Sequence, residues 1–178
     1  MMSEAEFFAG ITGRSDDLVR LVAALRATGQ PFCLIGGLAV SHYVEPVVTL
    51  DADFAITTAT GVAEALRTAG FTVEAHSHSI NAVLPGSRLR IQVTVNDRYG
   101  AFPAHATEGE LFGVHLPVAA LEDLVQGKLW AATDPARRAS KRAKDEADLV
   151  RICEKHPAML PLIPAGLFAR IDQLRNPS

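Results

Sequence analysis

Two short groups of residues have the types and the spacing that phosphate and metal chemistry require. Gly36 and Gly37 follow the apolar run 32–35. Glycines let a backbone turn sharply and approach a ligand, and a helix that starts there offers unpaired N–H groups to a phosphate. Asp51 and Asp53 lie two positions apart, so in a strand their carboxylates point to one face. Such carboxylates repel each other unless a cation lies between them, and their oxygens suit Mg²⁺ or Mn²⁺.

Each group alone also has a purely structural explanation. The glycine pair fits a tight strand-to-helix turn, and the aspartate pair fits a solvated strand face or a helix cap. Together, fourteen positions apart, they match the needs of nucleotidyl transfer from a triphosphate. In that chemistry one site cradles the β- and γ-phosphates while divalent ions hold the oxygens around the α-phosphate.

Residues 33–56, CLIGGLAVSHYVEPVVTLDADFAI, resemble the signature of the polymerase-β-type nucleotidyltransferase superfamily, a hydrophobic-GG or GS turn followed by Dx[DE]. Leu116–Val118, Leu121–Leu124, Gly127–Ala131, Arg137–Asp145 and Asp148 are similar to the LxxLKLxAxxxRxKDxxDL region of AbiEii-type nucleotidyltransferases. Those proteins are the toxin halves of some bacterial toxin–antitoxin and phage-abortive pairs. The resemblance covers about residues 30–155. It implies Mg²⁺-dependent transfer of a nucleoside monophosphate to a hydroxyl of RNA, protein or a small molecule, and an antitoxin partner.

The resemblance also assigns roles to individual residues. It implies that Gly36 and Gly37 face the triphosphate, that Ser41 assists them, and that Asp51 and Asp53 hold the metal ions. Lys128 would contact phosphate or lock the helical part onto the site. Lys144 and Asp145 fall on the Lys-Asp pair of the family pattern.

One position departs from the superfamily pattern, which expects a third carboxylate on a later strand. The matching strand, 89–95, has Gln92 at the polar position that fits. An amide oxygen ligates weakly and is no base at pH 7. Asp97, at the end of the same strand, is a candidate substitute. The alternatives are therefore an active transferase, a catalytically silent nucleotide-binding protein, and a structural or antitoxin-like module without nucleotide affinity.

A basic run follows Pro135 and places five positive charges within eight positions: Arg137, Arg138, Lys141, Arg142 and Lys144. Its helical i,i+4 pairs have the base N-terminal to the acid, which is the less favourable order for helix stability. Contact with a triphosphate or a nucleic-acid backbone is one explanation, and a solvated helix start is the other. Tyr99, Phe102 and Phe112 lie around a loop, where they would either stack on a base or anchor the loop.

The periodicity predicts the elements that position these residues. We expect helices over 17–28, 38–43, 61–69, 119–132, 139–154 and 165–174, and strands over 32–35, 51–56, 71–74, 80–84 and 89–95. The Pro85-Gly86 turn would make the last two strands a hairpin. The predicted fold class is α/β (α+β), with a small mixed sheet in a core of residues 1–116. A helical part, 117–178, would pack on this core.

Composition excludes several other classes of protein. The chain has 178 residues, 48% hydrophobic and 21% charged, with a net charge of −3, which is unlike a disordered chain. Two cysteines cannot form a disulfide framework or a zinc finger, and we expect both to be buried. Without a long apolar run or a basic leader, we expect a cytoplasmic protein with no membrane partner.

Overall fold

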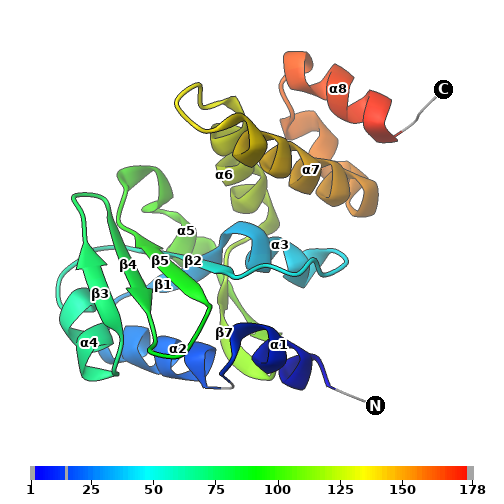
Figure 1. Ribbon diagram of the computed structural model, residues 1–178. Coiled ribbons are helices and arrows are strands. Elements are labelled where there is room, and N and C mark those ends of the chain that lie inside the picture. Colours follow the sequence, from blue (N-terminus) through cyan, green and yellow to red (C-terminus); the bar gives the residue numbers. More distant parts are fainter. Residues whose placement is uncertain (1–2, 15, 176–178) are drawn as a thin grey trace.

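The strands form one seven-stranded mixed sheet in a computed structural model, which describes residues 3–14 and 16–175 (Figure 1). The strands are β1 (Phe32–Ile35), β2 (Asp51–Ile56), β3 (Thr72–Ala75), β4 (Ser79–Val83), β5 (Arg90–Thr94), β6 (Thr107–Leu111) and β7 (Val114–Val118). Their order is β3-β4-β5-β2-β1-β7-β6. The pairs β2–β5 and β1–β7 are parallel, and the other neighbours are antiparallel.

Helices flank this sheet along the whole chain. The α-helices are α1 (Glu4–Thr12), α2 (Asp17–Ala27), α3 (Gly36–Tyr43), α4 (Val62–Thr68), α5 (Phe102–His105), α6 (Leu121–Thr133), α7 (Ala139–Lys155) and α8 (Ala165–Arg175). Short 3₁₀ helices are η1 (Asp97–Tyr99) and η2 (Pro157–Leu162). These elements confirm the α/β class expected from the sequence. In the part of the chain that the structure describes, no helix has the length and apolar character needed to cross a bilayer.

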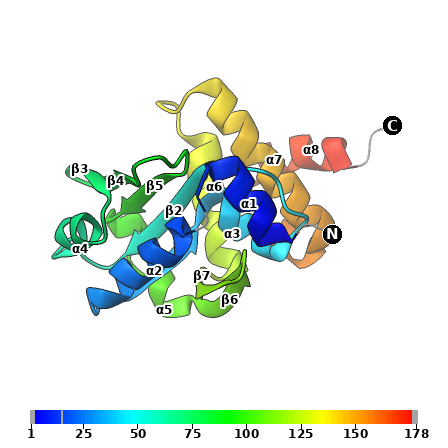
Figure 2. The same cartoon turned by 60° about the horizontal axis from the view of Figure 1, so that its bottom comes forward.

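The two faces of the sheet differ in polarity, because buried and polar side chains alternate along its strands. Ile80, Ile91, Val93 and Phe54 are buried on the face that packs in the main core, which also takes in α2 and α4. Figures 1 and 2 show these two helices side by side on that face. The polar positions of β2 to β5 therefore lie on the opposite face, toward α6 and α7.

A second hydrophobic cluster joins the C-terminal helices to the sheet domain. Val40 and Val44, at α3, pack with Val125 and Leu129 of α6 and with apolar residues of α7 and α8. Figure 1 shows α6, α7 and α8 on the side of the sheet away from α2 and α4. Helix α3 thus contributes to both clusters, and it links the glycine turn to the helical part. The division at residue 116 remains a prediction, and this position lies within β7.

The segment 107–118 differs from the sequence-based expectation, which placed no strand there. It forms the β6–β7 hairpin, whose turn places Phe112 at φ 52° and Gly113 at φ 79°. Strand β7 then pairs in parallel with β1 and extends the sheet by two strands. The sequence-based division placed the start of the helical part at 117, whereas Pro117 lies inside β7 and pairs in register with Glu108 of β6.

Both cysteines are buried, as expected from their apolar surroundings. Burial raises the pKa of the Cys33 thiol to about 12. A thiol with such a pKa is not a nucleophile at neutral pH, so Cys33 is a core residue.

Candidate active site

The glycine turn places the start of α3 directly against the second aspartate. Ile35 is the register partner of Asp53, and Gly36 follows it with φ +70°. A Cβ at Gly36 would collide with the Asp53 carboxylate. The position therefore needs glycine both for its left-handed backbone and for the close approach. No side chain caps the first turn of α3, so its N–H groups remain available to an anion.

The two aspartates project from β2 into one cavity, as their spacing predicted. The Asp51 Oδ1 accepts a hydrogen bond from Arg90 Nε at 2.7 Å, and its Oδ2 lies 3.9 Å from Lys141 Nζ. Burial raises the pKa of Asp53, and the charge of Asp51 raises it further. Lys128, Lys144 and Arg137 partly offset this rise. The carboxylate pair thus concentrates negative charge that a cation would relieve.

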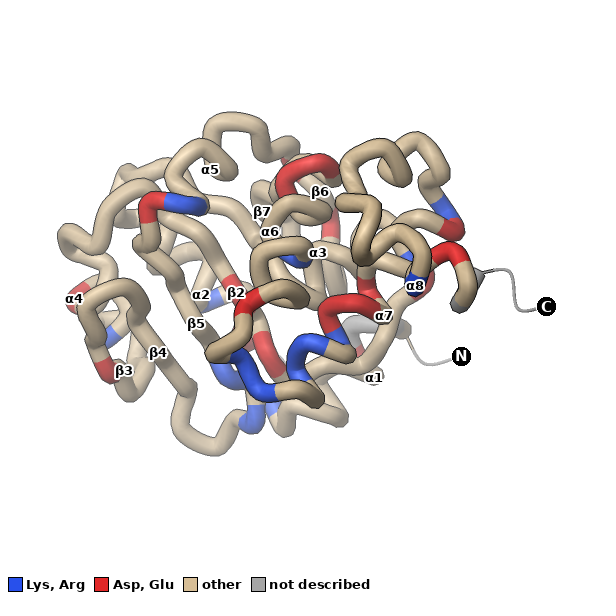
Figure 3. The backbone as a smooth tube through the Cα atoms, turned by 90° about the horizontal axis from the view of Figure 1, so that it is seen from above, with Lys and Arg blue, Asp and Glu red and all other residues tan. Residues whose placement is uncertain are grey.

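The cavity in front of these aspartates has a volume of about 440 Å³, within the range of small-ligand sites. A second cavity of about 180 Å³ adjoins it and shares Asp53 and Gln92 with it. Of the predicted site residues, the larger cavity brings together Gly37, Asp51, Asp53, Gln92, Lys128, Arg137, Lys141 and Lys144. Gly36 lines the smaller one. Figure 3 shows basic positions at the start of α7 near the acidic positions of β2.

Ser41 and Arg138 lie outside both cavity linings, and so does Arg142 of the basic run. The Ser41 hydroxyl donates to the Gly37 carbonyl at 3.1 Å and accepts from the Val47 N–H at 3.3 Å. This buried side chain therefore ties α3 to the segment that leads into β2. Arg138 precedes α7 and is exposed, with its backbone carbonyl accepting the first hydrogen bonds of that helix.

Lys128 joins α6 to α7 through a buried ion network. Its Nζ lies 2.9 Å from Asp145 Oδ1 and 2.6 Å from Asp148 Oδ2. Arg137 pairs with Asp145 at 2.8 Å, and Arg151 pairs with Asp148 at 2.9 Å. The two carboxylates raise the pKa of Lys128 although burial opposes this, so the side chain stays charged. The network fixes two helices of the helical part to each other, so it gives Lys128 a structural role within that part.

Gln92 is the direct neighbour of Asp53 in the parallel pair β2–β5. It therefore holds the place expected for a third carboxylate, and its Nε2 donates to Asn81 Oδ1 at 3.4 Å. Asp97 begins η1 beyond the end of β5 and lines neither cavity. Among the described residues, no hydrogen bond or ion pair joins Asp97 to the aspartate pair.

The aromatic residues considered for base stacking separate into two groups. Tyr99 and Phe102 line the smaller cavity, and both pack against Trp130 of α6. Phe112 instead stacks on Phe8 of α1, with ring centroids 4.1 Å apart. Loop anchoring accounts for Phe112, whereas Tyr99 and Phe102 lie where a base or a ribose could reach them.

Several polar residues of the cavity were not singled out from the sequence. Thr49 accepts the Asp51 N–H at 3.2 Å, and Arg90 holds the Asp51 carboxylate. Glu74 and Asn81 line the cavity from β3 and β4. Strand alternation would place Arg90 and Gln92 on one face, but the alignment of Glu74 with them depends on the register of three strands.

The carboxylate pair fits a magnesium site that is completed by other ligands. Among residues 3–14 and 16–175, no group of three or more His, Cys, Asp or Glu side chains is arranged to hold a metal ion. Mg²⁺ commonly takes one or two carboxylates and fills its remaining positions with water and substrate phosphates. Asp51 and Asp53 supply those two carboxylates, and burial and mutual repulsion favour a cation between them.

Comparison with solved structures supplies the name of the fold. The chain is similar to the antibiotic-resistance factor ANT(2'')-Ia, with a TM-score of 0.60 and 15% identity over 88% of this chain and 92% of that one. This chain has the nucleotidyltransferase fold. It is also similar to JHP933 from Helicobacter pylori, with TM-score 0.57 and 17% identity over 98% and 75% of the two chains. The lincosamide antibiotic adenylyltransferase LnuA aligns with TM-score 0.50 and 14% identity over 74% and 93%.

The nucleotidyltransferase fold is therefore shared at low sequence identity. No protein-family model matches the chain. No curated protein matches it either. The AbiEii-type resemblance of the C-terminal block consequently remains a prediction from the sequence.

Proposed function

We propose that this protein transfers a nucleoside monophosphate from a nucleoside triphosphate to a hydroxyl group, with Mg²⁺ at Asp51 and Asp53. One observation carries the proposal: Gly36, at the start of α3, is packed against the Asp53 carboxylate. A phosphate held by the α3 N–H groups would thereby lie beside the carboxylate pair. The nucleotidyltransferase fold supports the same chemistry.

In this reaction the acceptor oxygen forms a bond to the α-phosphorus, and the bond from that phosphorus to the bridging oxygen breaks. Pyrophosphate leaves, and the hydroxyl proton passes to water or to a carboxylate. The bound cation would neutralise charge on the phosphate oxygens. Lys144 projects into the cavity without an ion pair among the described residues, so it is available to the departing phosphates. Lys141, 3.9 Å from Asp51, lies on the same wall.

A labelled-transfer assay tests the proposal. Each of four α-labelled ribonucleoside triphosphates is incubated with the protein, Mg²⁺ and one acceptor: bacterial RNA, the protein itself, or a hydroxyl-bearing antibiotic. The antibiotic is included because structural neighbours are described as acting on tobramycin and lincosamides. We expect label in one acceptor, and its loss in Asp51→Asn and Asp53→Asn. Transfer that survives both substitutions would refute the metal assignment.

A second candidate function is nucleotide binding without turnover. The observation that favours it is the register pair of Asp53 and Gln92, which places an amide where a base would be expected. It predicts triphosphate binding with no labelled product for any acceptor. It also predicts that Gln92→Asp raises Mn²⁺ affinity and yields product. Robust transfer by the unmodified chain would exclude this candidate.

The toxin role and the antitoxin partner are further proposals, and they rest on the AbiEii-type resemblance alone. They predict that expression of the chain in a bacterial host arrests growth, and that Asp51→Asn restores it. Normal growth with the unmodified protein at the same expression level would contradict the toxin role while leaving the transferase proposal intact.

A further inference from the structure

The cavity continues beyond the aspartate pair along a row of aligned polar residues. Asp53 pairs in register with Gln92 of β5, Gln92 pairs with Asn81 of β4, and Asn81 pairs with Glu74 of β3. Residues directly opposite each other on neighbouring strands share one face of a sheet. The four side chains therefore lie on the cavity face, and all four line the cavity.

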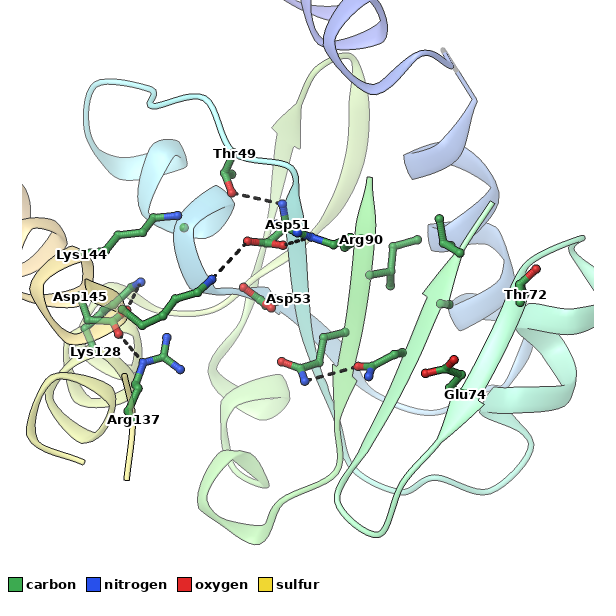
Figure 4. A pocket seen from close by; sticks show the side chains of 17 residues that line it. Thr49, Asp51, Asp53, Thr72, Glu74, Arg90, Lys128, Arg137, Lys144 and Asp145 are labelled. Atoms are coloured by element: carbon green, nitrogen blue, oxygen red, sulfur yellow. Dashed lines mark hydrogen bonds and ion pairs between the residues drawn. The ribbon is translucent and has the colours of Figure 1, made fainter. Parts of the chain in front are cut away.

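The two ends of this cavity differ in their charged side chains. Lys128, Lys144 and Arg137 project from the helical wall at one end, and Glu74 lies at the other end with Thr72 (Figure 4). The Glu74 carboxylate is exposed and makes no ion pair or hydrogen bond among the described residues. Phosphates would bind at the basic end, since Lys144 there is the one lining cation without a carboxylate partner among the described residues.

Strand spacing separates Glu74 from the reacting centre. Neighbouring strands lie about 4.8 Å apart, so the Cα atoms of Glu74 and Asp53 are about 14 Å apart across three ladders. Glu74 is thus too distant to hold the metal ion or to take the hydroxyl proton. At this distance from Asp53, Glu74 could contact the far end of an acceptor molecule whose hydroxyl reaches the α-phosphate.

We propose that the β3–β4 end of the cavity is the acceptor subsite, and that it binds a small, amine-bearing polyol through Glu74. This inference rests on the proposed transferase function. Asn81 and Thr72 offer hydrogen bonds to hydroxyls, while Glu74 offers an ion pair to a protonated amine. An RNA acceptor fits this end poorly, because its phosphates would face an unpaired carboxylate.

Binding of two matched probes tests the subsite without any need for turnover. The first probe is a deoxystreptamine amino sugar, whose amines are protonated at pH 7, and the second is its fully N-acetylated derivative. Calorimetry measures both affinities, and a short RNA serves as a third ligand. We expect the unmodified protein to bind the amine form at least about tenfold more tightly than the acetylated form.

Substitutions assign the preference to Glu74. Glu74→Gln should remove most of the preference for the amine form, and Asn81→Asp should increase it by adding a second carboxylate. The matched control is Glu64→Gln on α4, an exposed glutamate outside the cavity lining that pairs with Arg67 at 3.9 Å. Its preference should equal that of the unmodified protein.

The outcomes separate this inference from the proposed function. Equal affinity for the two probes, no binding of either, or an unchanged preference in Glu74→Gln would overturn the subsite. Aspartate-dependent labelling of RNA in preference to the amino sugar would also overturn it while leaving the transferase in place. Amine-selective binding that depends on Glu74, without labelled product from any triphosphate, would uphold the subsite and count against the transferase.

Discussion

Lys128→Met tests whether the buried ion network holds α6 against α7. The substitution keeps most of the apolar stem of the side chain and removes the charge that lies between Asp145 and Asp148. Breaking a buried ion pair from one side leaves an uncompensated charge, which costs about 3–5 kcal/mol. Arg137 and Arg151 still pair with the two carboxylates, so we expect the lower end of this range.

The expected loss of about 3 kcal/mol corresponds to a fall in Tm of about 6–12 °C for a chain of this size. Urea denaturation measures the free energy of unfolding, and an unchanged m-value would show that the denatured state is unaltered. Lys144→Met is the matched control. Lys144 lines the same cavity, but it is exposed and has no ion pair among the described residues, so its substitution should change stability by less than about 0.5 kcal/mol.

A double-mutant cycle identifies the partner. Because Asp148 no longer needs a cation once it is neutral, Lys128→Met combined with Asp148→Asn should cost less than the sum of the single substitutions. The reasoning fails if Lys128→Met lowers Tm no more than Lys144→Met does, or if the two single costs simply add.

Three further predictions concern the aspartates and the glycine turn. Burial raises the pKa of Asp53, so its ionised form disfavours folding. Asp53→Asn should therefore raise the Tm of the metal-free protein near pH 7, and this gain should vanish as the pH falls to the ordinary carboxyl pKa of 3.8. A variant Tm below that of the unmodified protein at pH 7 would contradict this. Gly36→Ala should lower the free energy of unfolding, measured by urea denaturation, by about 1–3 kcal/mol, because of the positive φ at this position and the collision of the new Cβ with Asp53. In the control Gly37→Ala the new Cβ would approach nothing closer than 3.9 Å, so the loss should be less than about 1 kcal/mol. Equal losses would disprove the packing argument. Arg90→Gln should change the free energy of unfolding by less than about 1 kcal/mol, since the Arg90 side chain is 70% exposed. The same substitution frees the Asp51 carboxylate, so it should tighten Mn²⁺ binding as measured by electron paramagnetic resonance. Weaker Mn²⁺ binding would show that Arg90 supports the site instead.

The centre of the site was predictable because it depends on local sequence. The glycine turn after β1 and the Asp51–Asp53 spacing each specify a geometry within a few residues, and the structure brings them together. The face of Gln92 was also predictable, because alternation in 89–95 places Arg90, Gln92 and Thr94 on one face, with Gln92 in the middle. Contact between Gly36 and Asp53 required in addition that β1 and β2 pair with Ile35 opposite Asp53.

The rest of the site depends on pairings that no local pattern specifies. Glu74 belongs to the cavity only because β3, β4 and β5 align residue by residue, and a shift of one position would turn it to the opposite face. The β6–β7 hairpin was missed for a similar reason, since its place beside β1 comes from a long-range parallel pairing. Ser41 was expected near phosphate, but its hydroxyl completes a backbone link between α3 and the approach to β2.

The adjacent residues Lys144 and Asp145 show how one short motif serves both the fold and the site. Successive residues of an α-helix point about 100° apart, so the two side chains leave α7 in different directions. Asp145 is buried and accepts from Lys128 and Arg137, which fixes α7 against α6. Lys144 is exposed in the cavity and keeps its charge available. A rigid carboxylate therefore positions, one residue away, a lysine that has no ion pair among the described residues, so the lysine and the aspartate occur together here without pairing with each other.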